Sequence, residues 1–173
     1  MTLLASGSIF LVGFMGSGKT TVGRLLAERL GCRFIDLDEQ IAQHAGKSIR
    51  QIFSEDGEAA FRLIESKLLN EIACQGRAVV SVGGGAFVSQ ANQETIHAHG
   101  VSVWLDCPFE IIVKRLEGTR DRPLYQSREQ LRALWESRQS SYAQAMIHVQ
   151  THDVSPHAVV EVIMRRLRQR LDG

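Results

Sequence analysis

A chain of 173 residues, 44% hydrophobic and 23% charged, has the composition of a globular protein and the length to bury one substantial core. Its formal net charge of +1 gives no reason to expect a nucleic acid or a membrane surface as partner. The three cysteines are isolated, and no segment reads as a secretory signal or a membrane span. We therefore expect a single cytoplasmic domain, residues 1–173, that binds neither membrane nor nucleic acid.

The first motif lies between a predicted strand and a predicted helix. Ser8–Val12 is a short apolar run typical of a buried strand, and apolar residues recur at helical spacing after Thr20. Between them, Gly13-Phe14-Met15-Gly16-Ser17-Gly18-Lys19-Thr20 fits G-x-x-x-x-G-K-S/T, the phosphate-binding P-loop. Such a loop places backbone N–H groups and the positive end of a helix around anionic oxygens. The motif predicts a bound nucleoside triphosphate, with Lys19 reaching its β- and γ-phosphates.

Strands and helices alternate along the rest of the chain. The predicted strands after the first are Arg33–Ile35, Ala78–Val82, Val101–Leu105 and Ile147–Val149. The predicted helical stretches lie around Ile41, at Ile49–Phe53 after the N-cap candidate Ser48, at Glu58–Gln75, from Pro108, at Gln130–Ala145 and from Pro156. This alternation predicts a three-layer α/β/α fold with a central five-stranded parallel sheet.

Polar and glycine-rich segments follow several of these strands. Asp36 and Asp38 come directly after the second strand, and Gly83–Gly85 follow the third. Because ligands of such sheets bind at the carboxyl ends of the strands, we expect these segments and the P-loop to meet at one site.

These motifs together resemble the shikimate kinases, small P-loop enzymes of aromatic amino-acid biosynthesis. The resemblance covers nearly the whole chain. It rests on the P-loop with Thr21-Val22-Gly23-Arg24, and on Phe34–Asp38, Ile52-Phe53, Gly57–Arg62, Gly83–Gly85, Arg122-Pro123-Leu124 and Arg138 ahead of Tyr142. It implies a P-loop kinase fold that transfers the γ-phosphate of ATP to the 3-hydroxyl of shikimate, with Mg²⁺ as cofactor. The implied partners are the two small substrates, and the implied assembly is a monomer.

The resemblance also implies a role for each candidate residue. A planar guanidinium matches a carboxylate, which suits Arg62 and Arg138 to the acid group of the acceptor. Asp38 hydrogen-bonds the reacting hydroxyl, as a general base or only to orient it. The implied catalytic residues are Lys19, Asp38 and Arg122; the nucleotide-binding residues Gly16, Ser17, Gly18, Lys19, Thr20, Thr21 and Arg122; the shikimate-binding residues Asp38, Arg62, Gly83, Gly84, Gly85 and Arg138; and the metal-side residues Thr20 and Asp36. Arg122 lies in a polar segment, about residues 117–127, that we expect to form a mobile lid.

Several alternatives stay open at the level of sequence. Asp36 also suits a helix N-cap, and Arg132 is a further candidate for the site. Departures from the family pattern occur at Leu37, Tyr125 and Gln139–Ser141, and adenine recognition is expected near Asp153–Pro156. The histidine pairs His97/His99 and His148/His152 lack metal-ligand spacing, and Arg165–Arg170 reads as the solvated face of a terminal helix.

Other functions also remain possible. A gluconate or nucleoside-monophosphate kinase would share the fold. A regulatory GTPase would need a guanine-specifying N-K-x-D motif, which this sequence lacks. A kinase-like binding protein without catalysis would have lost Lys19, Asp38 or an arginine of the set, and all are present.

Overall fold

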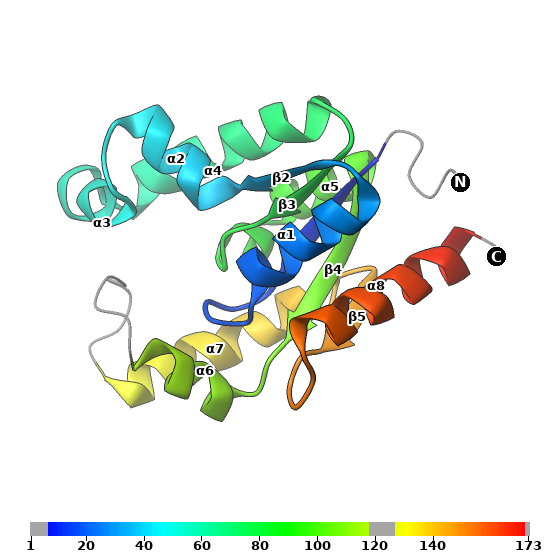
Figure 1. The fold of residues 1–173 in the computed structure, drawn as a ribbon. Helices are drawn as coiled ribbons and strands as arrows, with labels where there is room; N and C mark the ends of the chain where they lie inside the picture. The colour runs from blue at the N-terminus through cyan, green and yellow to red at the C-terminus, as the bar shows by residue number, and fades with distance from the viewer. Residues whose placement is uncertain (1–6, 118–126, 172–173) are drawn as a thin grey trace.

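The computed structural model describes residues 7–117 and 127–171, which form a five-stranded parallel sheet with the strand order β2-β3-β1-β4-β5 (Figure 1). The strands are β1 (Ser8–Val12), β2 (Arg33–Asp36), β3 (Ala78–Ser81), β4 (Gly100–Asp106) and β5 (Ile147–Gln150). The predicted sheet is thus confirmed. Because β1 pairs with both β3 and β4, the P-loop leaves the sheet at its centre, where the connections diverge to opposite sides.

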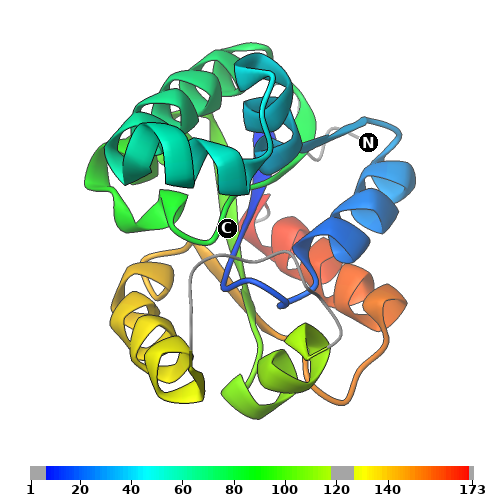
Figure 2. The same ribbon diagram turned by 90° about the vertical axis from the view of Figure 1, so that its left-hand side faces the viewer.

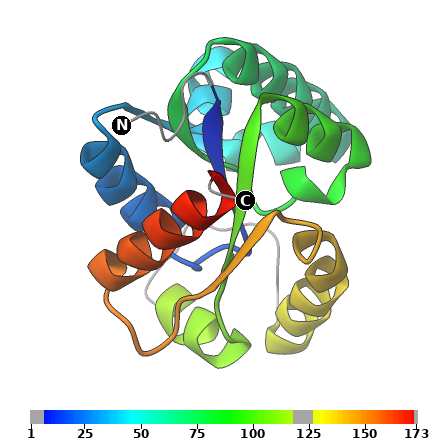
Figure 3. The same ribbon diagram turned by 90° about the vertical axis from the view of Figure 1, so that its right-hand side faces the viewer.

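Helices cover both faces of this sheet. The helices are α1 (Lys19–Leu30), α2 (Leu37–Ala45), α3 (Ile49–Gln51), α4 (Gly57–Cys74), α5 (Gln90–His99), α6 (Phe109–Leu116), α7 (Arg128–Tyr142) and α8 (Pro156–Leu171), with a π-helical turn η1 (Ile52–Asp56) and a 3₁₀ turn η2 (Ala86–Val88). Helices α1 and α8 lie side by side on one face, while α2, α4, α5 and α7 pack on the other (Figures 2 and 3). This is the predicted three-layer arrangement.

The central strand is apolar from Ile9 to Val12 because it is buried on both faces. Ile9 and Leu11 pack in the core beneath α1 and α8, whereas Phe10 and Val12 pack in the core on the opposite face. The alternation of side chains along β1 therefore joins two hydrophobic cores through one strand.

Two elements were not predicted, and one was predicted with the wrong geometry. The turn η2 and helix α5 fill a stretch without a strong periodic signal, since α5 buries only Asn92 and Ile96. The segment after Ser48 was expected to be one helix, but α3 is short and continues as the π-helical turn η1, which Gly57 ends at a φ of 85°. Arg122 and most of the expected lid of about residues 117–127 fall on residues 118–126, outside the described residues.

Candidate active site

The segments that follow β1, β2 and β3 line one cavity of about 590 Å³. Further lining residues come from α2, α3, η1, α4, α6, α7, the segment after β5 and the start of α8. The predicted site residues that lie within the described part of the chain all line it: Gly16, Ser17, Gly18, Lys19, Thr20, Thr21, Asp36, Asp38, Arg62, Gly83, Gly84, Gly85 and Arg138. Residues far apart in the sequence are thus brought to one site, as the parallel sheet predicts.

The P-loop curves tightly at the start of α1. Gly16 and Gly18 adopt φ values of 76° and 96°, which favour glycine because a Cβ would crowd the backbone. Nζ of Lys19 donates to the backbone oxygens of Gly13, over 2.7 Å, and of Phe14, over 2.9 Å. The first turn of α1 has no acidic residue, so its N–H groups and the Lys19 ammonium present positive charge to the cavity.

Thr20, Asp36 and Asp38 form a chain of hydrogen bonds beside the P-loop. The Thr20 hydroxyl donates to Oδ2 of Asp36 over 3.0 Å, and the backbone N–H of Asp38 donates to Oδ1 of Asp36 over 3.0 Å. Asp36 is therefore the N-cap of α2, as one interpretation of the sequence proposed, and its other carboxylate oxygen accepts from the P-loop threonine. A hydroxyl and a carboxylate in this position are oxygen donors of the kind that Mg²⁺ prefers.

Each glycine of the segment Gly83–Gly85 faces a different charged side chain. A Cβ built on Gly83 would lie 2.9 Å from Oδ1 of Asp38, and one on Gly84 would lie 3.2 Å from a guanidinium nitrogen of Arg138. A Cβ on Gly85 would lie 2.6 Å from a guanidinium nitrogen of Arg62. The absence of side chains at these positions lets one carboxylate and two guanidinium groups approach the same turn.

The two arginines are held in different environments. Arg62 on α4 donates to Glu65 over 2.8 Å and lies 3.3 Å from Glu58, and part of its side chain stays exposed. Arg138 on α7 is buried and its guanidinium carbon lies 5.5 Å from the centre of the Phe14 ring. The cavity therefore holds two cationic groups that can bind an anion, one of them stacked on an aromatic residue of the P-loop.

Glu65 is a functional candidate that the sequence analysis missed. Its side chain is 1% exposed, and its Oε1 has no hydrogen-bond partner among residues 7–117 and 127–171. That oxygen lies 3.0 Å from the position of a Cβ on Gly83. Burial raises the pKa of Glu65, and the neighbouring Arg62 opposes the rise. Its spacing of three residues from Arg62 on a helix was the available sequence signal.

Arg115 on α6 was also missed. It donates to the backbone oxygen of Gly16 over 2.8 Å and lines the cavity together with Val154 and Pro156. The segment Asp153–Pro156, expected to recognise adenine, thus contributes to the cavity beside an unpredicted arginine. A single arginine near a helix end carries no sequence signal that separates it from a solvated charge.

Arg132, a further candidate from the sequence, is not among the residues that line the cavity. It binds Glu110 over 2.7 Å and lies above the Phe109 ring at 4.3 Å.

Within the described residues, no group of three or more His, Cys, Asp and Glu side chains could hold a metal ion. Among those residues, no helix is long and apolar enough to span a membrane.

A parallel sheet with a P-loop at its central strand, and a carboxylate with two arginines across one cavity, define the class of P-loop small-molecule kinases. The sequence model of the family described as shikimate kinase matches residues 15–168. The chain therefore belongs to the shikimate kinase family, which is a family of enzymes.

Individual shikimate kinases are similar to this chain over nearly its full length. A shikimate kinase of Persephonella marina is 43% identical and covers 93% of this chain and 99% of its own length. One of Gloeobacter violaceus is 45% identical, over 98% of this chain and 97% of its own. A shikimate kinase of Acinetobacter baumannii, solved in complex with shikimate, superposes with a TM-score of 0.91 at 35% identity, covering 95% of this chain and 94% of that one.

Proposed function

We propose that this protein transfers the γ-phosphoryl group of ATP to the 3-hydroxyl of shikimate, giving shikimate 3-phosphate in the pathway to aromatic amino acids. The observation that carries the assignment is the glycine turn, where Gly83, Gly84 and Gly85 face Asp38, Arg138 and Arg62. Shikimate is a small triol with one carboxylate, so it needs cationic groups at one end and a hydroxyl acceptor at the other. The cavity offers both.

The acceptor lies against the glycine turn. Arg62 and Arg138 bind its carboxylate, because guanidinium groups match that anion with paired N–H donors. Backbone N–H groups of the turn donate to the acceptor, with Gly84 in contact with it. Glu65 orients Arg62 through their 2.8 Å ion pair.

The nucleotide occupies the other half of the cavity. Backbone N–H groups from Gly16 to Thr21 and the Lys19 ammonium bind the phosphates. Thr20 and Asp36 would hold Mg²⁺, which when bound supplies positive charge that offsets the charge of the β- and γ-phosphate oxygens. The base lies beside Arg115, Val154 and Pro156, which line that end of the cavity.

Asp38 accepts a hydrogen bond from the 3-hydroxyl and directs its oxygen at the γ-phosphorus. As the new P–O bond forms and the bond to ADP breaks, the hydroxyl proton passes to Asp38 or to solvent. The transition state of phosphoryl transfer is loose, so orientation by Asp38 and charge from Lys19 carry most of the acceleration. Arg122, on the proposed lid at about residues 117–127, reaches the transferring phosphate and excludes water.

The protein acts as a single domain, a monomer and a cytoplasmic enzyme. A 173-residue chain buries a sufficient core without a partner, and its three cysteines form no disulfide framework, which suits a reducing compartment. Its molecular mass in solution, by light scattering, tests the monomer.

The activity is tested by ADP release from Mg·ATP with a panel of acceptors. Shikimate should be turned over, whereas gluconate, AMP and buffer alone should give much slower release. Shikimate methyl ester, which keeps the hydroxyls but lacks the anion, separates recognition of the carboxylate from recognition of the ring. Release of ADP at the same rate with and without shikimate would overturn the assignment.

A further inference from the structure

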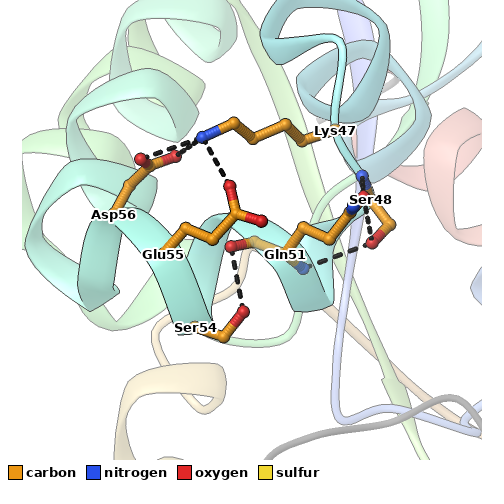
Figure 4. Close-up of polar contacts among 6 residues, drawn as sticks. All are labelled: Lys47, Ser48, Gln51, Ser54, Glu55 and Asp56. Carbon is orange, nitrogen blue, oxygen red and sulfur yellow. Dashed lines mark hydrogen bonds and ion pairs between the residues drawn. The ribbon is translucent and has the colours of Figure 1, made fainter.

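Lys47 lies between two acidic side chains, Glu55 and Asp56 (Figure 4). Its Nζ is 2.9 Å from Oε2 of Glu55, and 2.9 and 3.0 Å from the two carboxylate oxygens of Asp56. The Lys47 side chain is 34% exposed, less than either acid. Hydrogen bonds with Asp56 and Glu55 raise the pKa of Lys47. We call these three residues the Lys47 cluster.

The Lys47 cluster closes a loop of chain that joins two helices. Gly46 ends α2 with a φ of 64°, and Ser48 then begins α3 with a reciprocal capping box to Gln51 (Figure 4). Asp56 is the last residue of η1 and directly precedes α4. Lys47 therefore ties the carboxyl end of α2 to the amino end of α4 across the segment that connects them.

That segment forms part of the cavity. Ile49 and Phe53 both line it, and the Phe53 ring packs on Phe61, with ring centres 4.6 Å apart. Helix α2 presents Asp38 to the cavity, and α4 presents Arg62. The Lys47 cluster thus joins α2 and α4, the helices that carry Asp38 and Arg62, although its own residues are not among those that line the cavity.

The segment between α3 and α4 has an unusual backbone geometry. Residues Ile52–Asp56 form a π-helical turn, closed by a hydrogen bond from the Gly57 N–H to the Ile52 oxygen. Such turns are rare because their wider winding packs less well, and they recur at functional sites. The buried Ile52, the ring contact of Phe53 and the Lys47 contacts all help to hold this turn in place.

We propose that the Lys47 cluster is a positioning device for the acceptor, which holds the cavity surface formed by Ile49 and Phe53 in the shape that receives shikimate. The inference rests on the proposed function, since it assigns that surface to the acceptor. Lys47 itself touches neither substrate and is a positioning residue. If the contacts of Lys47 are lost, residues 48–56 become less ordered in the free protein. Acceptor binding must then order them again, and the free energy which this ordering costs lowers the acceptor affinity.

The test is steady-state kinetics of Lys47→Met in the otherwise intact chain. The acceptor KM should rise about three- to tenfold, while kcat and the KM for ATP stay within about twofold of the wild type. Lys47→Arg keeps the cation and should restore most of the acceptor KM. Arg29→Met is the matched control, because it removes an exposed ion pair, with Glu161, between α1 and α8. It should change none of these constants.

A double-mutant cycle and hydrogen exchange separate positioning from simple stability. Lys47→Met and Asp56→Asn combined should raise the acceptor KM no more than Lys47→Met alone, because either change breaks the same contact. In the substrate-free protein, amides of residues 48–56 should exchange faster in Lys47→Met, and those of α1 should not. Asp56→Asn alone repeats the test if Lys47→Met does not fold.

Two results would overturn the proposal. An unchanged acceptor KM with a lower melting temperature would mean that the cluster only stabilises the fold. A change in kcat or in the KM for ATP instead would mean that it acts on another part of the cavity. The exchange experiment needs no substrate, so failure of shikimate turnover in the wild type would overturn the proposed function while the contact between Lys47 and residues 48–56 is still tested.

Discussion

The hydroxyl of Tyr142 donates to the backbone oxygen of Gly84 over 2.5 Å, although the two residues are 58 positions apart in the sequence. Tyr142 ends α7 and is fully buried. The hydrogen bond from Tyr142 thus links the middle of the glycine turn to α7, the helix that also carries Arg138. The position of the proposed carboxylate site and that of the turn are therefore set by the same helix.

Replacement of Tyr142 by Phe tests two separate features, the bond to Gly84 and the titration of the buried phenol. Burial raises the pKa of Tyr142 to about 12, so the folded protein holds the phenolic proton more tightly than the unfolded chain, whose tyrosine has a pKa near 10. The corresponding stability, about 2–3 kcal/mol, is present below about pH 10 and is lost as the pH rises towards about 12.

Urea unfolding of the wild type and of Tyr142→Phe at several pH values measures this contribution. At neutral pH the variant should be less stable by about 1–3 kcal/mol, because the Gly84 oxygen loses its donor. Its free energy of unfolding should then fall less between about pH 10 and pH 12 than that of the wild type. Parallel pH profiles for the two proteins would show that Tyr142 does not titrate as described.

Replacement of Asp38 by Asn keeps the shape of the side chain and removes its charge. We expect kcat to fall by about 10²–10⁴, the range for loss of a general base, or less if Asp38 only orients the hydroxyl. Mg·ATP binding, measured by calorimetry, should change little because Lys19 and the P-loop remain. A variant with the kcat of the wild type would exclude both roles of Asp38.

Replacement of Arg62 or Arg138 by Ala should weaken shikimate binding rather than ATP binding. Each charge-assisted hydrogen bond contributes about 1.5–3 kcal/mol, so the dissociation constant should rise at least about tenfold for each variant. Because both guanidinium groups bind one carboxylate, the losses should not add in the double variant.

Shikimate methyl ester serves as the control for both arginine variants. Each arginine change should cost much less with the ester than with the free acid, since the ester lacks the anion. Equal losses for ester and acid would mean that the arginines shape the cavity without binding the carboxylate.

Replacement of Gly85 by Ala should disturb Arg62 without straining the backbone. Gly85 has a φ of −96°, which alanine adopts readily, but its Cβ would lie 2.6 Å from an Arg62 guanidinium nitrogen. We expect a rise of about tenfold or more in the shikimate dissociation constant, with Mg·ATP binding unchanged.

Gly84→Ala provides the matched comparison for Gly85→Ala. Its Cβ would meet Arg138 at 3.2 Å, a milder contact, so a loss of affinity in Gly84→Ala would arise mainly where the Cβ meets the bound acceptor. If Gly85→Ala bound shikimate as tightly as the wild type, the approach of Arg62 to the turn would not matter for the acceptor.

The sheet, the P-loop and the candidate residues at the strand ends could all be predicted from the amino-acid sequence. These features are local: a buried parallel strand is a continuous apolar run, and a phosphate loop is a fixed spacing of glycine, lysine and threonine. The strand Ser8–Val12 was predicted with its observed bounds for this reason. Asp36 and Asp38 were placed at the site because they directly follow a strand.

Which side chains lie together could not be predicted in the same way, because it depends on how the elements pack. The burial of Glu65, the contact of Arg115 with Gly16 and the pairing of Lys47 with Asp56 each depend on how the helices and loops pack. Arg132 and Arg138 are both arginines of α7, six positions apart, yet one pairs with Glu110 near the surface and the other lies buried in the cavity. Spacing along the chain fixes which residues a helix carries, whereas the packing of that helix on the sheet decides which of them reach the site.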